Sequence, residues 1–88
     1  TGGIVMDKVL IDIFLPAINR SFEVYIPLDS KFYEITPLVS KMLSELSNGL
    51  FISGDDSILY ERKTGNILNI NMSARQLNIK NGDNLMLL

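Results

Sequence analysis

The sequence predicts an α+β domain in which a mixed sheet of about four to five strands packs on a single helix. Three observations indicate this fold class: apolar residues alternate near both ends of the chain, apolar residues recur with helical spacing in the middle, and turn-forming residues separate these segments. At 88 residues the chain has room for one hydrophobic core, so we expect one domain. A hydrophobic content of 47% with 20% charged residues is typical of a packed globule and not of a disordered chain.

The N-terminal part of the chain predicts a β-hairpin. From Lys8 to Leu15 every second residue is strongly apolar, and the segment from Ser21 to Pro27 alternates in the same way. Between them, residues 16–20 (PAINR) supply turn chemistry. We therefore expect two half-buried strands joined by a tight turn.

The middle of the chain predicts the helix, from about Pro37 to Ser47, and allows an irregular turn from Phe32 onward. Thr36 can cap it, Pro37 suits the first helical position, and Asn48-Gly49 tolerate the left-handed backbone that ends a helix. A stripe of apolar residues recurs at a spacing of three and four, which predicts the face that covers the sheet. Its members are Leu38, Val39, Met42, Leu43 and Leu46.

The C-terminal half predicts two short strands, one helical turn and a last strand. The strands are expected at Ser57 to Arg62 and at Ile67 to Ile70, and the turn from Ser73 to Leu77, where Ser73 and Gln76 have the spacing of a capping box. The last strand, Asn84 to Leu88, is as apolar as the first. Two such strands are expected to be central neighbours in a sheet covered by the helix, which is the β-grasp arrangement.

The segment from Gln76 to Leu87 (QLNIKNGDNLML) carries a resemblance to the ubiquitin-like superfamily, whose members often close with a helical turn, a polar-Gly-Asp turn and a last strand. With the Pro-started segment Thr36 to Val39, the resemblance covers Lys8 to Leu88. Within the superfamily the chain looks most like the bacterial YukD/EsaB group of type VII secretion accessory proteins. We expect residues 8–88 to form the ubiquitin-like domain and residues 1–7 to be an N-terminal extension or an artificial remnant.

The residue types present exclude several chemistries. Without His or Cys, the chain cannot form a Ser-His or Cys-His pair or an imidazole-ligated metal site, so we expect no enzyme and no cofactor. The alternative to a domain without metal is a cation site formed by the carboxylates of Asp55, Asp56 and Glu61. A solvated turn explains these residues more simply. A net charge of −2 without a basic stripe predicts no nucleic-acid partner. Apolar runs far shorter than the roughly 20 residues of a membrane span predict no direct membrane insertion.

The predicted alternation places several apolar residues on the sheet face away from the helix. This candidate protein-interaction face consists of Leu10, Phe14, Tyr25, Met86 and Leu88. A contiguous apolar group on an open face marks a partner surface, and partners of ubiquitin-like domains commonly bind there. The alternative is that Leu10 and Phe14 only shield the hairpin and that Asp12 and Glu23 interrupt the patch. The same face also allows a homodimer.

Together these features predict a noncatalytic protein-interaction module, an accessory component of a bacterial type VII (ESX/Yuk-like) secretion system. The expected partner is a protein, with a membrane secretion component as the leading candidate. The resemblance implies a cytoplasmic location, at the inner face of the membrane where a partner or a fused membrane domain holds the module. Alternatives are a regulatory or substrate-recognition domain of a larger protein and, less favoured, a carrier or modifier protein, because the chain ends Met86-Leu87-Leu88 and not in Gly-Gly.

Overall fold

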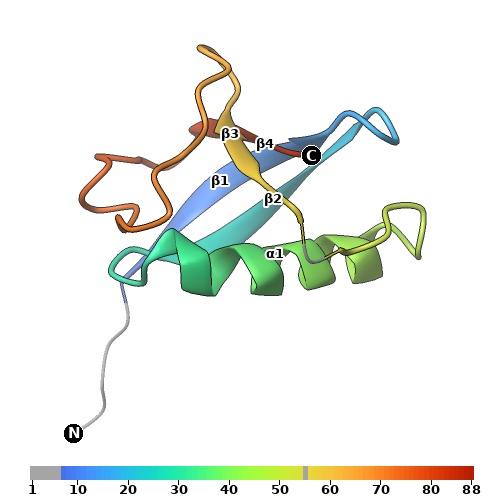
Figure 1. Cartoon of the computed structure of the whole chain (residues 1–88), viewed down its shortest axis with the longest axis horizontal. Helices are drawn as coiled ribbons and strands as arrows, with labels where there is room; N and C mark the ends of the chain where they lie inside the picture. Colours follow the sequence, from blue (N-terminus) through green and yellow to red (C-terminus); the bar gives the residue numbers. More distant parts are fainter. Residues whose placement is uncertain (1–6, 55) are drawn as a thin grey trace, which may run out of the picture.

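A computed structural model of the chain describes residues 7–54 and 56–88, and the expectations for residues 1–6 and for Asp55 lie outside these ranges. The elements follow the order β1 (Lys8–Leu15), β2 (Arg20–Pro27), α1 (Phe32–Leu46), β3 (Leu59–Glu61) and β4 (Asn84–Leu87) (Figure 1). The sheet has the order β2-β1-β4-β3, with β1 and β4 parallel in the centre. This confirms a mixed sheet on one helix with the first and last strands as central neighbours.

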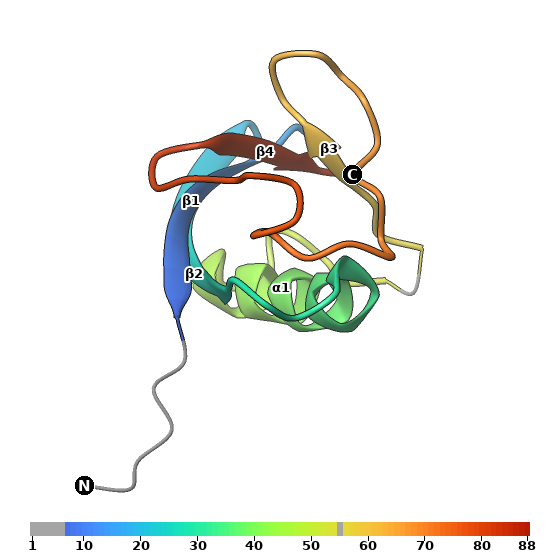
Figure 2. The same cartoon turned by 90° about the vertical axis from the view of Figure 1, so that its left-hand side faces the viewer.

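The sheet curves around α1 and leaves its other face open (Figure 2). In β1, the residues that alternate toward the helix are Val9, Ile11, Ile13 and Leu15, all of them buried. They pack with Leu85 and Leu87 of β4 and with buried residues of α1 in one hydrophobic core. Period-2 alternation therefore separates a core face from an open face along the whole of β1.

The helix begins at Phe32, earlier than the predicted start at Pro37. The backbone N–H groups of Phe32 and Tyr33 donate to the carbonyl oxygens of Met72 and Ile70, each at 3.0 Å. These bonds satisfy two of the N–H groups that every helix start leaves free, so the first turn is stabilised by a distant segment. Thr36 is not the cap, because its hydroxyl donates inside the helix to the Phe32 carbonyl at 2.7 Å, and Pro37 lies inside the helix.

The predicted apolar stripe of the helix is only half right. Val39 and Leu43 are buried, but Leu38, Met42 and Leu46 are 66%, 38% and 49% exposed. With the earlier start, Phe32 and Ile35 join the buried face and turn it away from Leu38. The C-terminal end is as predicted, since Asn48 and Gly49 adopt positive φ angles of 55° and 81°.

The predicted strand at Ile67 to Ile70 is wrong, since this segment makes only an isolated bridge between Tyr60 and Ile67. The Ile70 carbonyl bonds to the helix start instead, so it cannot extend the ladder. The predicted capping box is confirmed: the N–H of Ser73 donates to Oε1 of Gln76 at 2.9 Å, and the N–H of Gln76 donates to Oγ of Ser73 at 3.2 Å. The N–H of Leu77 donates to the Ser73 carbonyl at 3.0 Å and closes one helical turn.

Arg75 connects this helical turn to the loop before α1 and to the start of β1. Its guanidinium donates to Asp29 at 2.6 Å and to Asp7 at 2.8 Å. The hydrogen bond from Arg75 lowers the pKa of Asp29, and because the groups are exposed, water screens the pair. Arg75 thus positions the turn more than it stabilises the fold.

Candidate functional site

The open face of the sheet contains all five residues of the predicted interaction face. Leu10 lies directly opposite Tyr25 across β1 and β2, and Phe14 lies opposite Met86 across β1 and β4. Leu88 follows β4 and exchanges two backbone hydrogen bonds of 3.1 Å with Ile58. The alternation of the strands directs these side chains away from α1.

The five residues form two groups on the open face. Phe14, Met86 and Leu88 belong to the larger group, which also includes Tyr60, opposite Met86 in β3, and Ile58. We call these five residues the Phe14 cluster. Leu10 and Tyr25 form a separate pair toward the other end of the hairpin. The face therefore offers two apolar areas and not one continuous patch.

Two carboxylates separate the apolar areas. Asp12 and Glu23 are register partners in β1 and β2. The N–H of Leu28 donates to the Asp7 carbonyl at 3.0 Å, so Asp7 and Leu28 are a hydrogen-bonded pair. Hydrogen-bonded and non-hydrogen-bonded pairs alternate along an antiparallel ladder, which makes Asp12–Glu23 a non-hydrogen-bonded pair. The side chains of such a pair lie closer together. Oδ1 of Asp12 is buried without a hydrogen-bond partner in the described residues. The sequence-based alternative that these acids interrupt the patch matches this geometry.

Arg62 adds a positive charge to the Phe14 cluster. Its guanidinium carbon lies 4.3 Å from the centroid of the Phe14 ring. A cation over an aromatic face at this distance contributes about 0.5–1 kcal/mol at an exposed site. The arginine is therefore held over the cluster, where it can meet an acidic or polar group of a partner.

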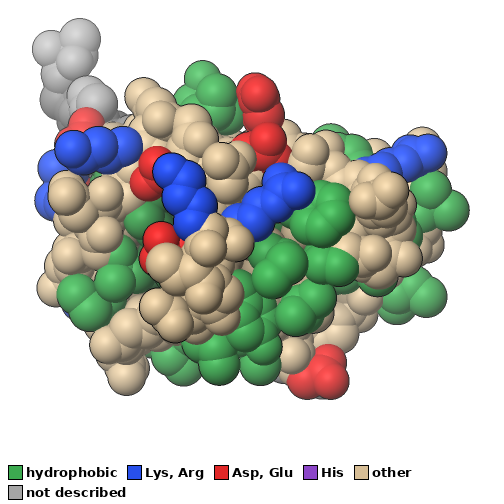
Figure 3. All heavy atoms as spheres, turned by 90° about the horizontal axis from the view of Figure 1, so that it is seen from above, with side chains coloured by type: hydrophobic (Ala, Val, Ile, Leu, Met, Phe, Trp, Pro, Cys, Tyr) green, Lys and Arg blue, Asp and Glu red, His purple; other side chains and the backbone are tan. Residues whose placement is uncertain are grey.

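Ile58, Tyr60 and Arg62 lie beside the predicted interaction face but were not among its predicted residues. The signal was present in the alternation of residues 58, 60 and 62, which places them on one face of the extended segment that contains β3. Seen from above, hydrophobic side chains gather in groups beside Lys, Arg and acidic side chains (Figure 3). The open face combines apolar side chains with the Asp12–Glu23 pair and Arg62.

Candidate metal ligands are sparse. Within residues 7–54 and 56–88, no group of three or more acidic side chains is arranged to hold a metal ion. The alternative prediction was a cation site at Asp55, Asp56 and Glu61. Asp55 lies outside the described residues, Asp56 is exposed, and Glu61 is half-buried in β3. In the described part of the chain, no helix is long and apolar enough to span a bilayer.

The strand order, the single covering helix and the open sheet face define the ubiquitin-like β-grasp fold. Among solved structures, the ubiquitin-like domain of the type VII secretion system protein ECCD1 of Mycobacterium tuberculosis is similar with a TM-score of 0.75 at 14% identity, over 94% of this chain and 99% of that chain. The EccD5 ubiquitin-like domain from Mycobacterium xenopi gives a TM-score of 0.79 at 15% identity, over 93% of each chain.

A third similar structure is a chain of the MycP5-free ESX-5 inner membrane complex, with a TM-score of 0.76 at 14% identity. The match covers 92% of this chain and 20% of that chain, so the present sequence spans about a fifth of its length. No protein-family model and no curated protein matches the sequence. Identities this low show a shared fold, and any shared role is an inference from that fold.

Proposed function

We propose that the chain is a noncatalytic protein-interaction module that docks through its open face onto a larger component of a type VII secretion system. The observation that carries this proposal is the Phe14 cluster, in which side chains from β1, β3 and β4 meet on the sheet face opposite α1. Apolar groups gathered on an exposed face are typical of partner surfaces. The flanking Arg62 and the Asp12–Glu23 pair supply the polar contacts that give such a surface specificity.

The similar structures support the choice of partner. Two of them are ubiquitin-like domains named for type VII secretion proteins, and the third belongs to an inner membrane complex. We infer that the module acts on the cytoplasmic side of the membrane in a bacterial system, as the YukD/EsaB resemblance implies. Its partner is then a membrane secretion component, or a membrane segment of the same polypeptide holds it there.

The absence of catalysis in this proposal follows from the residue types. The sequence contains neither His nor Cys, so the usual general bases and thiol nucleophiles are missing. The open face carries apolar groups, one arginine and two carboxylates, which suit recognition more than bond cleavage. Binding is therefore the activity that this surface supports best.

Affinity capture from the native cell extract tests the proposal. The bait is the 88-residue chain, compared with a variant that carries Phe14→Asp and Met86→Lys in the Phe14 cluster. We expect the unchanged chain to recover secretion-system components and the variant to lose about tenfold or more of that recovery, because central apolar contacts carry most of the binding energy of an interface. Equal recovery by both proteins would contradict docking at the open face.

A matched variant controls for charge and for folding. Leu38→Asp with Leu46→Lys introduces the same charges on exposed positions of α1 and should leave recovery unchanged. Because Phe14 is half-buried, Tyr25→Asp serves as a second open-face variant at a position that is 61% exposed. Circular dichroism should give the same spectrum for every bait. Recovery of unrelated enzymes would favour the regulatory or substrate-recognition alternative.

A further inference from the structure

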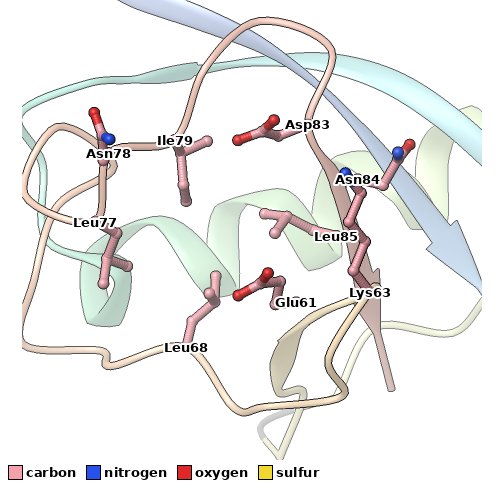
Figure 4. A pocket seen from close by; sticks show the side chains of 9 residues that line it. All are labelled: Glu61, Lys63, Leu68, Leu77, Asn78, Ile79, Asp83, Asn84 and Leu85. Carbon is pink, nitrogen blue, oxygen red and sulfur yellow. The ribbon is translucent and has the colours of Figure 1, made fainter.

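A cavity of about 230 Å³ lies on the helix side of the sheet, where β3 and β4 meet the segment from Leu77 to Ile79. Leu68 and Leu85 are buried at its wall, and Leu77 and Ile79 pack beside them. The side chains of Glu61, Asp83 and Leu85 point toward the space that Leu68, Leu77 and Ile79 enclose (Figure 4). The lining of the cavity is thus mostly polar, with two carboxylates among its polar groups and four leucine or isoleucine side chains beside them.

Glu61 occupies a position where the strand pattern calls for a core residue. It alternates with Leu59, which is 3% exposed, and its register partner in β4 is Leu85, which is 2% exposed. Glu61 itself is half-buried, so its carboxylate loses part of its hydration, and a paired cation normally offsets such a cost. In the described residues both ion pairs belong to Arg75, so Glu61 has none.

Asp83 brings the second carboxylate to the same cavity. Its Oδ2 accepts a hydrogen bond of 3.0 Å from the N–H of Lys80, which fixes the side chain and leaves Oδ1 for another donor. Lys63 also lines the cavity, but its side chain extends along β4 beside Leu85 and makes no ion pair with either carboxylate (Figure 4). The local charge of these three groups is therefore negative by one.

The volume limits what the cavity can hold. Sites for drug-sized ligands occupy about 300–1,000 Å³, so a cavity below that range suits a single side chain. The leucine and isoleucine side chains in the lining can pack on an aliphatic stem, and the two carboxylates fit a cationic end. A guanidinium has several N–H donors in one plane and can bond both carboxylates, which an ammonium does less well.

We propose that this cavity is an anchor site for one arginine side chain of a partner protein. The arginine stem packs on Leu68, Leu77 and Leu85, and its guanidinium donates hydrogen bonds to Glu61 and Asp83. Because the cavity opens on the helix side of the sheet, this contact is independent of docking at the open face, and the domain can use both surfaces at once.

A methyl NMR titration of the full 88-residue chain with N-acetyl-arginine N-methylamide tests this site. We expect saturable shifts at the methyl groups of Leu68, Leu77, Ile79 and Leu85, with an affinity on the order of millimolar, because one side chain contributes only a few kcal/mol of binding energy. Glu61→Gln should weaken the affinity about tenfold, since the amide oxygen still accepts a hydrogen bond but no longer carries the negative charge that strengthens it. Asp83→Asn provides a second variant with the same expected direction.

Two controls make the result specific. Glu45→Gln removes an exposed carboxylate from α1 and should leave the affinity unchanged, and the corresponding norleucine derivative, which lacks the cation, should cause no saturable shift. Shifts scattered over the surface, an equal response to norleucine, or unchanged affinity in both Glu61→Gln and Asp83→Asn would overturn the proposal. Equal affinity for the lysine derivative would contradict the selectivity for arginine.

Discussion

Single side chains hold the irregular segment between β3 and β4 in place, and Ser73 is the clearest example. It is 3% exposed, and its hydroxyl oxygen accepts a hydrogen bond from the N–H of Gln76. Gln76 in turn accepts from the N–H of Ser73, so each residue satisfies a donor of the other. Because the neighbouring carbonyls of Ile70 and Met72 cap α1, this reciprocal pair also positions the start of the helix.

Ser73→Ala should therefore lower the free energy of unfolding by about 1 kcal/mol, the usual cost of losing a helix cap. Urea denaturation followed by circular dichroism measures this change. Ser21→Ala, at an exposed position of β2, is the control and should change the midpoint little. A Ser73→Ala midpoint equal to that of the unchanged chain would mean that the capping box contributes nothing to stability.

At the scale of elements, the β1–β2 hairpin combines good packing with an unfavourable charge pair. The residues that face α1 are buried except for Phe22, which is half-buried, but Asp12 and Glu23 lie opposite each other on the open face. Like charges in directly opposite positions destabilise a strand pair. This loss of stability arises on the candidate docking face and not in the core, which is consistent with a role of the two carboxylates in recognition.

Replacing Glu23 with arginine should stabilise the domain by about 0.2–1 kcal/mol, because an opposite-charge pair replaces a like-charge pair. Glu23→Gln, which only removes the repulsion, should fall between the unchanged chain and Glu23→Arg. Chemical denaturation at low salt measures the series, and added salt should reduce the differences. If the arginine variant were no more stable than the unchanged chain, the two carboxylates would not repel each other as the register indicates.

Elements formed by contacts between residues close in sequence could be predicted, and elements that depend on contacts between distant residues could not. The hairpin, the capping box at Ser73 and the last strand follow from residues adjacent in sequence, and all three are confirmed. The start of α1 and the loss of a strand at Ile67 to Ile70 both depend on hydrogen bonds between α1 and residues 70–72. Such long-range bonds leave no pattern in the neighbouring sequence. The predicted helix start at Pro37 therefore rested on local helix-forming preferences alone.

At the scale of the whole molecule, one helix on one side of a curved sheet leaves two unlike surfaces. The open face carries the Phe14 cluster, and the helix side carries the cavity at Glu61 (Figure 4). The alternation of apolar residues predicted five residues of the open face. The register of all four strands was needed to show that they form two apolar areas and that Arg62 lies over Phe14. The Glu61 cavity depends on a crossing segment and had no sequence signal beyond one charged residue in a strand.

Photo-crosslinking from two matched tyrosine positions tests the central claim, docking at the open face, most directly. Tyr25 lies on the open face and Tyr33 on α1, and their exposed fractions, 61% and 53%, are similar. Each is replaced in turn by benzoylphenylalanine, and adducts formed in the native cell are identified by mass spectrometry. We predict adducts with a type VII secretion component from position 25 and none from position 33. Adducts from position 33 alone would contradict the claim and move the docking surface to the helix.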